Sequence, residues 1–134
     1  KKLRTSASHF AYKSAAIDTA SGPVLEQVAT LMRQHPELNL VIEAHTDDIG
    51  SRRYNMDLSQ ARALAVMDHL VERDVLPARM VPVGHGKNQP IASNKSEQGR
   101  ALNRRVEFRL VVKEPVPATS EMLSGASPKR SPKR

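Results

Sequence analysis

The sequence contains no cysteine and no tryptophan, and it has only two tyrosines and two phenylalanines among its 134 residues. The absence of cysteine excludes a disulfide framework, a Cys-ligated zinc site and thiol catalysis. No uninterrupted apolar stretch approaches the roughly 20 residues that a membrane-spanning helix requires. The chain begins with lysine rather than methionine and has no signal-like stretch there, so we expect a fragment of a larger protein, with any membrane anchor lying outside it.

Basic residues outnumber acidic ones and give a formal net charge of +7. The excess lies at the two ends: seven of the 21 Lys and Arg fall in residues 1–4 and 129–134, and the remaining 14 match the 14 Asp and Glu. A groove that follows nucleic acid needs clustered cations and usually aromatic platforms. The central part of the chain lacks both, and we expect no nucleic acid partner for the folded domain.

Composition divides the chain into three parts. Residues 1–7 form a basic N-terminal segment, and residues 8–113 have the apolar and charged content of one ordinary domain. Residues 114–134 are rich in proline and serine and end in a doubled Ser-Pro-Lys-Arg, which predicts a disordered basic tail.

Alternating apolar residues predict strands in the domain. This period of two covers residues 38–44 and 106–112. Residues 80–83 predict a short strand that runs into a glycine turn, and Phe10 and Tyr12 predict a weak first strand.

Apolar residues at helical spacing predict two helices, over residues 24–32 and 63–71, the second capped by Asp57 or Ser59. Residues 84–103 are expected to form a long loop. The order strand, helix, strand, helix, strand, loop, strand predicts an α+β fold. We expect a two-layer α/β sandwich: a four-stranded mixed sheet with the helices packed on one face and the last strand antiparallel to a neighbour.

A polar cluster follows directly after the strand predicted at residues 38–44. Asp47 lies at the carboxyl end of this strand, where ligand sites of open α/β sheets concentrate. Arg62 is expected in the first turn of the second helix, where a cation opposes the helix dipole unless it faces an anion. A guanidinium and free helix amides bind a carboxylate while Asp47 accepts from an ammonium, so the pair predicts a site for a zwitterionic amino-acid head group. An internal salt bridge between Asp47 and Arg62 is the alternative, and a ligand could insert into such a pair.

Several short motifs occur in a specific order and spacing: Ala44-His45-Thr46-Asp47, Gly50, Asn55, Leu58-Ser59, Arg62-Ala63, Gly84-His85-Gly86, Pro90, Asn94, Gly99-Arg100 and Asn103-Arg104-Arg105-Val106-Glu107. Together they resemble the OmpA-like peptidoglycan-binding domain that is shared by OmpA, the lipoprotein Pal and the stator protein MotB. The resemblance covers about residues 8–112. It departs at Ala44, where the family usually has glycine, and in the first strand, where Phe10 with Ser14-Ala15 keeps only part of the family pattern.

The resemblance implies non-covalent binding of peptidoglycan through the diaminopimelate of the stem peptide. On this basis Asp47 holds the ammonium of the ligand and Arg62 holds its carboxylate. The resemblance also implies that four further positions line the ligand-binding pocket: Thr46, Gly50, Asn55 and Leu58. Arg105 is implied as a supporting residue. Side-chain alternation sends the two arginines of Asn-Arg-Arg in opposite directions, so that one can face the pocket.

The implied function is to tether an envelope protein to the cell wall, in the periplasm or at the outer membrane of a Gram-negative bacterium. The sequence leaves open a monomer or a homodimer. It also leaves two other functions open: a basic-tailed module that docks on an anionic polymer or lipid, and the periplasmic domain of a MotB-like flagellar stator.

No catalytic, metal or cofactor site is expected. Asp47 and Asp48 are adjacent, and on extended backbone their side chains point apart, which makes a poor acid–base pair. The five histidines lack the spacing of the usual zinc helices. We therefore expect a binding module and not an enzyme.

Overall fold

The computed structural model describes residues 2–6 and 22–113. The strand predicted around Phe10 and Tyr12 and the tail predicted at residues 114–134 lie outside these residues. Within the two described ranges, no helix combines the length and the apolar character needed to cross a membrane.

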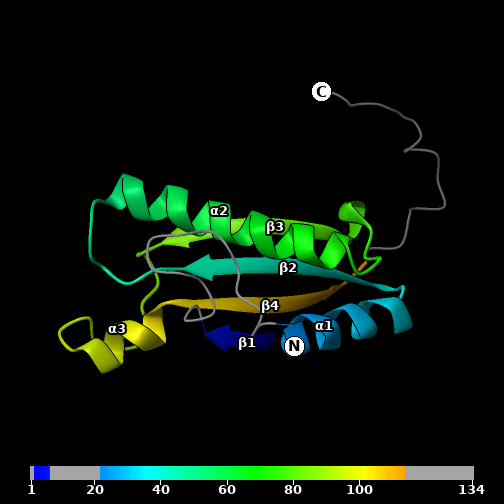
Figure 1. Cartoon of the computed structure of the whole chain (residues 1–134), viewed down its shortest axis with the longest axis horizontal. Helices are drawn as coiled ribbons and strands as arrows, with labels where there is room; N and C mark the ends of the chain where they lie inside the picture. Colours follow the sequence, from blue (N-terminus) through cyan, green and yellow to red (C-terminus); the bar gives the residue numbers. More distant parts are fainter. Residues whose placement is uncertain (1, 7–21, 114–134) are drawn as a thin grey trace.

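The sheet is mixed and has four strands in the order β1-β4-β2-β3 (Figure 1). β2 (Leu38–His45) pairs in parallel with β3 (Met80–Gly86) on one side and antiparallel with β4 (Arg105–Val112) on the other. β1 (Lys2–Ser6) pairs antiparallel with β4. The predicted mixed sheet and the antiparallel last strand are confirmed. β1 falls within residues 1–7, which the composition assigned to a basic segment, so the backbone of residues 2–6 of that segment belongs to the sheet.

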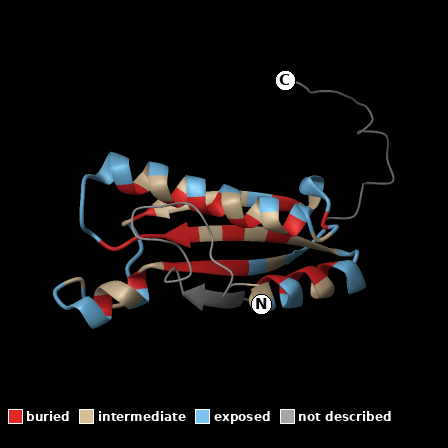
Figure 2. Cartoon of the chain, in the orientation of Figure 1, coloured by how far each residue is buried: buried red, intermediate tan, exposed pale blue. Residues whose placement is uncertain are grey.

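Two helices, α1 (Gly22–Gln34) and α2 (Arg52–Val71), pack on the sheet, and the buried residues gather where helices and sheet meet (Figure 2). In α1 the buried side chains recur at helical spacing, and in β2 the apolar buried residues alternate with residues of the other face. In β4 the apolar Val106 and Phe108 alternate with Arg105 and Glu107, which are also buried. The apolar core is made of apolar residues from both helices, from the segment after α2 and from strands β2, β3 and β4: Leu25, Val28, Ala29, Met32, Leu40, Ile42, Ala44, Ala63, Val66, Leu70, Val75, Met80, Val106 and Phe108. The predicted two-layer sandwich is therefore confirmed.

The start of α2 was predicted incorrectly. The helix begins at Arg52, not near Asp57 or Ser59, and its N-cap is Ser51, whose hydroxyl accepts the N–H of Tyr54 at 3.0 Å. The first turn carries exposed residues with no apolar stripe, so hydrophobic periodicity gives no signal there.

The long loop predicted at residues 84–103 contains a short helix, α3 (Glu97–Asn103). Its N-cap is Ser96, whose hydroxyl accepts the N–H of Gly99 at 3.0 Å. A Cβ atom added to Gly99 would lie 1.7 Å from the carbonyl oxygen of Ser93, so only glycine allows this close approach. This contact fixes α3 against the preceding segment, next to the start of β4.

Candidate functional site

The loop after β2 fixes the backbone and side chain of Asp47. The backbone N–H of Thr46 donates to the carbonyl of Gly86 at 2.9 Å, which extends the contact between β2 and β3 beyond the end of the strand. The Thr46 hydroxyl donates to the carbonyl of Asp47 at 2.8 Å, and the backbone N–H of Ile49 donates to Asp47 Oδ1 at 3.0 Å. The carboxylate is therefore held in one orientation by its own loop.

Asn55 and Gly50 complete this loop. The Asn55 amide Nδ2, from α2, donates to the carbonyls of Ile49 at 2.9 Å and Ser51 at 3.2 Å. Gly50 has a φ of 98°, in the left-handed region that favours glycine, and its carbonyl accepts from Lys87 Nζ at 3.0 Å. The predicted pocket residues Thr46, Gly50 and Asn55 therefore belong to one tightly bonded turn between β2 and α2.

Arg62 lies near the middle of α2 and is 4% exposed. Its expected place in the first turn of the helix was wrong, and so was the dipole argument, because the helix-end field falls off within the first turn. Burial lowers the pKa of the Arg62 guanidinium below its ordinary value, Tyr54 and Asp47 act to raise this pKa, and Arg104 acts to lower it. The charge of Asp47 therefore favours the charged form of Arg62. Leu58 lies half-buried on the same helix, one turn before Arg62.

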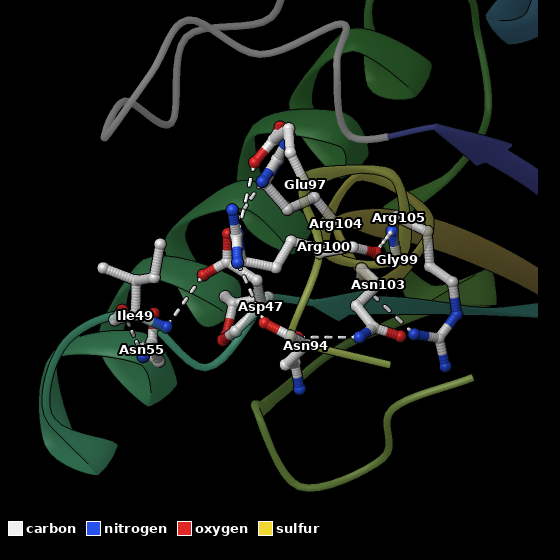
Figure 3. Close-up of polar contacts among 12 residues, drawn as sticks. Asp47, Ile49, Asn55, Asn94, Glu97, Gly99, Arg100, Asn103, Arg104 and Arg105 are labelled. Carbon is white, nitrogen blue, oxygen red and sulfur yellow. Dashed lines mark hydrogen bonds and ion pairs between the residues drawn. The ribbon is translucent and has the colours of Figure 1, made fainter. Parts of the chain in front are cut away.

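Arg104 is a residue that the sequence analysis did not assign to the site. Its Nη1 donates to Asp47 Oδ2 at 2.8 Å and its Nη2 donates to Glu97 Oε2 at 2.5 Å (Figure 3). The antiparallel register pairs His45 with Arg105, so the preceding Arg104 lies beside the loop that carries Asp47. Side-chain alternation predicted that one of Arg104 and Arg105 could face the pocket. Which one does so depends on the register between β2 and β4, which the sequence does not reveal.

Arg105 is buried and makes a separate set of contacts. Its Nε donates to Glu107 Oε2 at 2.7 Å, its Nη1 to the carbonyl of Asn103 at 3.2 Å and its Nη2 to the carbonyl of Gln89 at 2.9 Å. These bonds tie the start of β4 to the segment before α3. The support that Arg105 was expected to give to the ligand pocket stays a prediction.

His45, at the end of β2, lies among charged residues on the face of the sheet away from the apolar core. Its ring stacks on His85 with centroids 4.8 Å apart, and neither ring nitrogen has a hydrogen-bond partner among the residues that the structure describes. Burial lowers the pKa of His45 to about 4, and the positive charge of Arg105 acts in the same direction. His45 is therefore neutral at ordinary pH. The described part of the chain has no cluster of three or more His, Cys, Asp or Glu residues that could hold a metal ion.

The arrangement offers opposite charges to a ligand at one end of the sheet. Asp47 supplies carboxylate oxygens, which can accept from an ammonium group. Arg62 supplies a guanidinium group, which matches the two oxygens of a carboxylate.

Residues 9–104 match the OmpA family. The chain belongs to the OmpA family. Its expected membership, drawn from the order of short motifs, is confirmed, and a match over most of the described domain agrees with the mixed sheet and the two packed helices.

The chain is similar to curated proteins and to solved structures over most of its described domain. The chain is 46% identical over 83 residues to outer membrane porin F of Pseudomonas fluorescens, covering 62% of this chain and 26% of that protein. It is similar to the crystal structure of the peptidoglycan-associated lipoprotein from Burkholderia pseudomallei, with a TM-score of 0.73 and 32% identity over 77% of this chain and 87% of the other. A putative MotB-like protein from Desulfovibrio vulgaris gives a TM-score of 0.75 and 29% identity, covering 85% and 74%. The first curated relatives are longer proteins, of which the chain spans between 24% and 53%.

Proposed function

We propose that this chain binds peptidoglycan non-covalently through the free amino-acid end of diaminopimelate in the stem peptide, and so tethers an envelope protein to the cell wall. The observation that carries the proposal is that the carboxylate of Asp47, held by its own loop, favours the charge of Arg62, which is buried on a separate helix. A peptidoglycan-associated lipoprotein is among the similar solved structures, which supports the same polymer as the ligand.

The ammonium of the ligand is assigned to Asp47 and its carboxylate to Arg62. A planar guanidinium can bind both carboxylate oxygens, and a carboxylate has capacity for more donors than the one that its own loop supplies. Thr46, Gly50, Asn55 and Leu58 form or flank the turn between β2 and α2, and we assign them the lining of the pocket. Arg105 is assigned a supporting role from the start of β4.

Recognition in this proposal involves no chemical step. Asp47 is buried and tied to its loop, whereas Asp48 is exposed, so the two adjacent carboxylates differ in environment and do not face one reacting centre together. The function is placed in the periplasm or at the outer membrane of a Gram-negative bacterium, as a monomer or a homodimer. An anchor outside this chain would supply the attachment to the membrane.

Co-sedimentation with purified peptidoglycan sacculi tests the proposal. Asp47→Asn and Arg62→Gln each remove one charge from the pair, and each should abolish sedimentation, because a desolvated ligand charge left without its partner typically costs roughly 2 to 5 kcal/mol. Asp48→Asn and Arg53→Gln are the matched controls, since both residues are exposed and lie close in sequence to the site. The controls should sediment like the wild type, and circular dichroism should show that all four variants fold.

Unchanged sedimentation of both Asp47→Asn and Arg62→Gln would refute the assignment. Binding that is lost when the Lys and Arg residues at positions 1–4 and 129–134 are replaced by glutamine, and that weakens steeply with salt, would instead support docking of the basic ends on an anionic polymer or lipid. Substitution is used rather than removal because residues 2–4 belong to strand β1. The alternative of a MotB-like stator domain uses the same peptidoglycan site, and its likeness to a MotB-like structure makes it compatible with this proposal.

A further inference from the structure

Arg104 bridges two carboxylates that come from different parts of the chain. One nitrogen of its guanidinium bonds to Asp47 at 2.8 Å and the other to Glu97 at 2.5 Å (Figure 3). The Asp47 side chain is 11% exposed, that of Arg104 is 27% exposed and that of Glu97 is 65% exposed. The guanidinium therefore lies between a buried acceptor and an exposed one.

Both oxygens of Asp47 accept hydrogen bonds within the chain. Oδ1 accepts the backbone N–H of Ile49, and Oδ2 accepts from Arg104. An ammonium that approaches Oδ2 meets a guanidinium already bonded there, and two like charges at such a short separation repel each other. Arg104 and the ligand's ammonium therefore compete for the same oxygen.

Glu97 is a second carboxylate partner for the Arg104 guanidinium. Its Oε1 accepts from Arg100 Nε at 3.2 Å, and Arg100 is itself held through a bond of 2.9 Å from Nη1 to the carbonyl of Asn94. The hydrogen bond to Glu97 is the main cause that raises the pKa of Arg104, ahead of the bond to Asp47. Arg104 can therefore leave Asp47 and keep a charged partner.

We infer that Arg104 is a positioning residue that occupies Asp47 in the free chain and passes to Glu97 when the ammonium of a ligand arrives. This inference rests on the proposed function, since it names the internal competitor at the same site. The chain with Arg104 on Asp47 is not competent to bind the ammonium, so the apparent affinity is lower than the intrinsic affinity by the competent fraction.

Two substitutions should change the affinity in opposite directions. Arg104→Gln removes the competitor and should tighten binding. Glu97→Gln takes away the alternative partner, so that Arg104 depends on Asp47 alone, and should weaken binding. A purely structural role for this cluster predicts instead that both substitutions weaken binding or leave it unchanged.

Isothermal titration of the full chain with meso-diaminopimelate measures both effects. We expect Arg104→Gln to bind roughly two- to fivefold more tightly than the wild type and Glu97→Gln to bind more weakly by a similar factor, the scale of a partly exposed ion pair. An unchanged or weaker affinity for Arg104→Gln overturns the inference, as does a tighter affinity for Glu97→Gln. The latter variant alters an exposed side chain, so its result does not depend on whether Arg104→Gln folds.

Pimelate, which has the two carboxylates but no ammonium, separates competition from a general opening of the pocket. Arg104→Gln should increase the affinity for diaminopimelate and not the affinity for pimelate, because Arg104 competes only with the ammonium group. Equal tightening of both ligands overturns the inference. If the wild type fails to bind diaminopimelate, the proposed function and this inference are overturned together. If the wild type binds diaminopimelate and Arg104→Gln does not bind it more tightly, the inference alone is overturned.

Discussion

Replacement of Asn103 by alanine should destabilise the fold more than any single hydrogen bond would suggest. The side chain is fully buried at the end of α3 and makes four hydrogen bonds. Its Oδ1 accepts the N–H groups of Ile91 at 2.7 Å and Ala92 at 3.0 Å, and its Nδ2 donates to the carbonyl of Ala92 at 2.9 Å and to Asn94 Oδ1 at 2.8 Å. It thereby ties the segment before α3 to the residue that precedes Arg104.

The cost of Asn103→Ala follows from the groups that lose their partner. Each net hydrogen bond is worth about 1 kcal/mol, and a buried donor or acceptor left unsatisfied costs about 1 to 3 kcal/mol. The partners at Ile91 and Asn94 are not fully buried, and water can replace part of what they lose. We therefore expect a loss of roughly 2 to 4 kcal/mol in the free energy of unfolding.

Urea unfolding followed by circular dichroism measures this loss, with amide hydrogen exchange at Ile91 and Ala92 as the local readout. Asn94→Ala is the matched control, because it removes only one of the four bonds and should cost no more than about 1 kcal/mol. A loss below about 1 kcal/mol for Asn103→Ala, with unchanged exchange at both amides, would show that the reasoning about these bonds is wrong.

Two further predictions concern buried groups. Burial, aided by Arg105, lowers the pKa of His45 to about 4 in the folded chain. Between pH 6.5 and 4 the unfolded chain therefore binds a proton at this histidine and the folded chain does not. The free energy of unfolding should fall by up to about 3 kcal/mol as the pH drops through this range. His45→Phe should lose this slope in urea titrations at several pH values, whereas the control His35→Asn should keep it; equal slopes in all three proteins would contradict the assignment. Gly99→Ala should cost roughly 1 to 3 kcal/mol or more, because its Cβ would overlap the carbonyl of Ser93, and a melting temperature equal to that of the wild type would refute the close approach.

Strands β2 and β4 and both long helices could be predicted from the sequence because each buries an apolar face, whereas β1 was missed because its residues were assigned to a basic segment. The alternation in β2 and β4 and the helical stripe of α1 leave a clear period in the chain. The first turns of α2 bury little apolar surface and depend on the Ser51 cap, so their start was missed. The helix α3 was missed because it is short and contains Gly99, which lowers helix propensity and is present for a tertiary contact.

The site was predictable in part. Asp47 follows the end of a buried strand, a position where ligand groups gather, and Arg62 was found through the spacing of the family motif. The reason first given for Arg62 was wrong, because the helix starts well before it. Arg104 could not be assigned from the sequence, since its contact with Asp47 depends on the register between β2 and β4, and a shift of one residue would place Arg105 there instead.

Calorimetric titration of the full chain with meso-diaminopimelate and with its monoamide tests whether Arg62 pairs with a carboxylate of the ligand. Conversion of the carboxylate at the recognised end to an amide removes the charge assigned to Arg62 and leaves the shape of the ligand almost unchanged. We predict measurable binding of diaminopimelate and a loss of at least about tenfold with the amide, the equivalent of about 1.4 kcal/mol. Equal affinity for the acid and the amide would contradict the pairing of Arg62 with a ligand carboxylate.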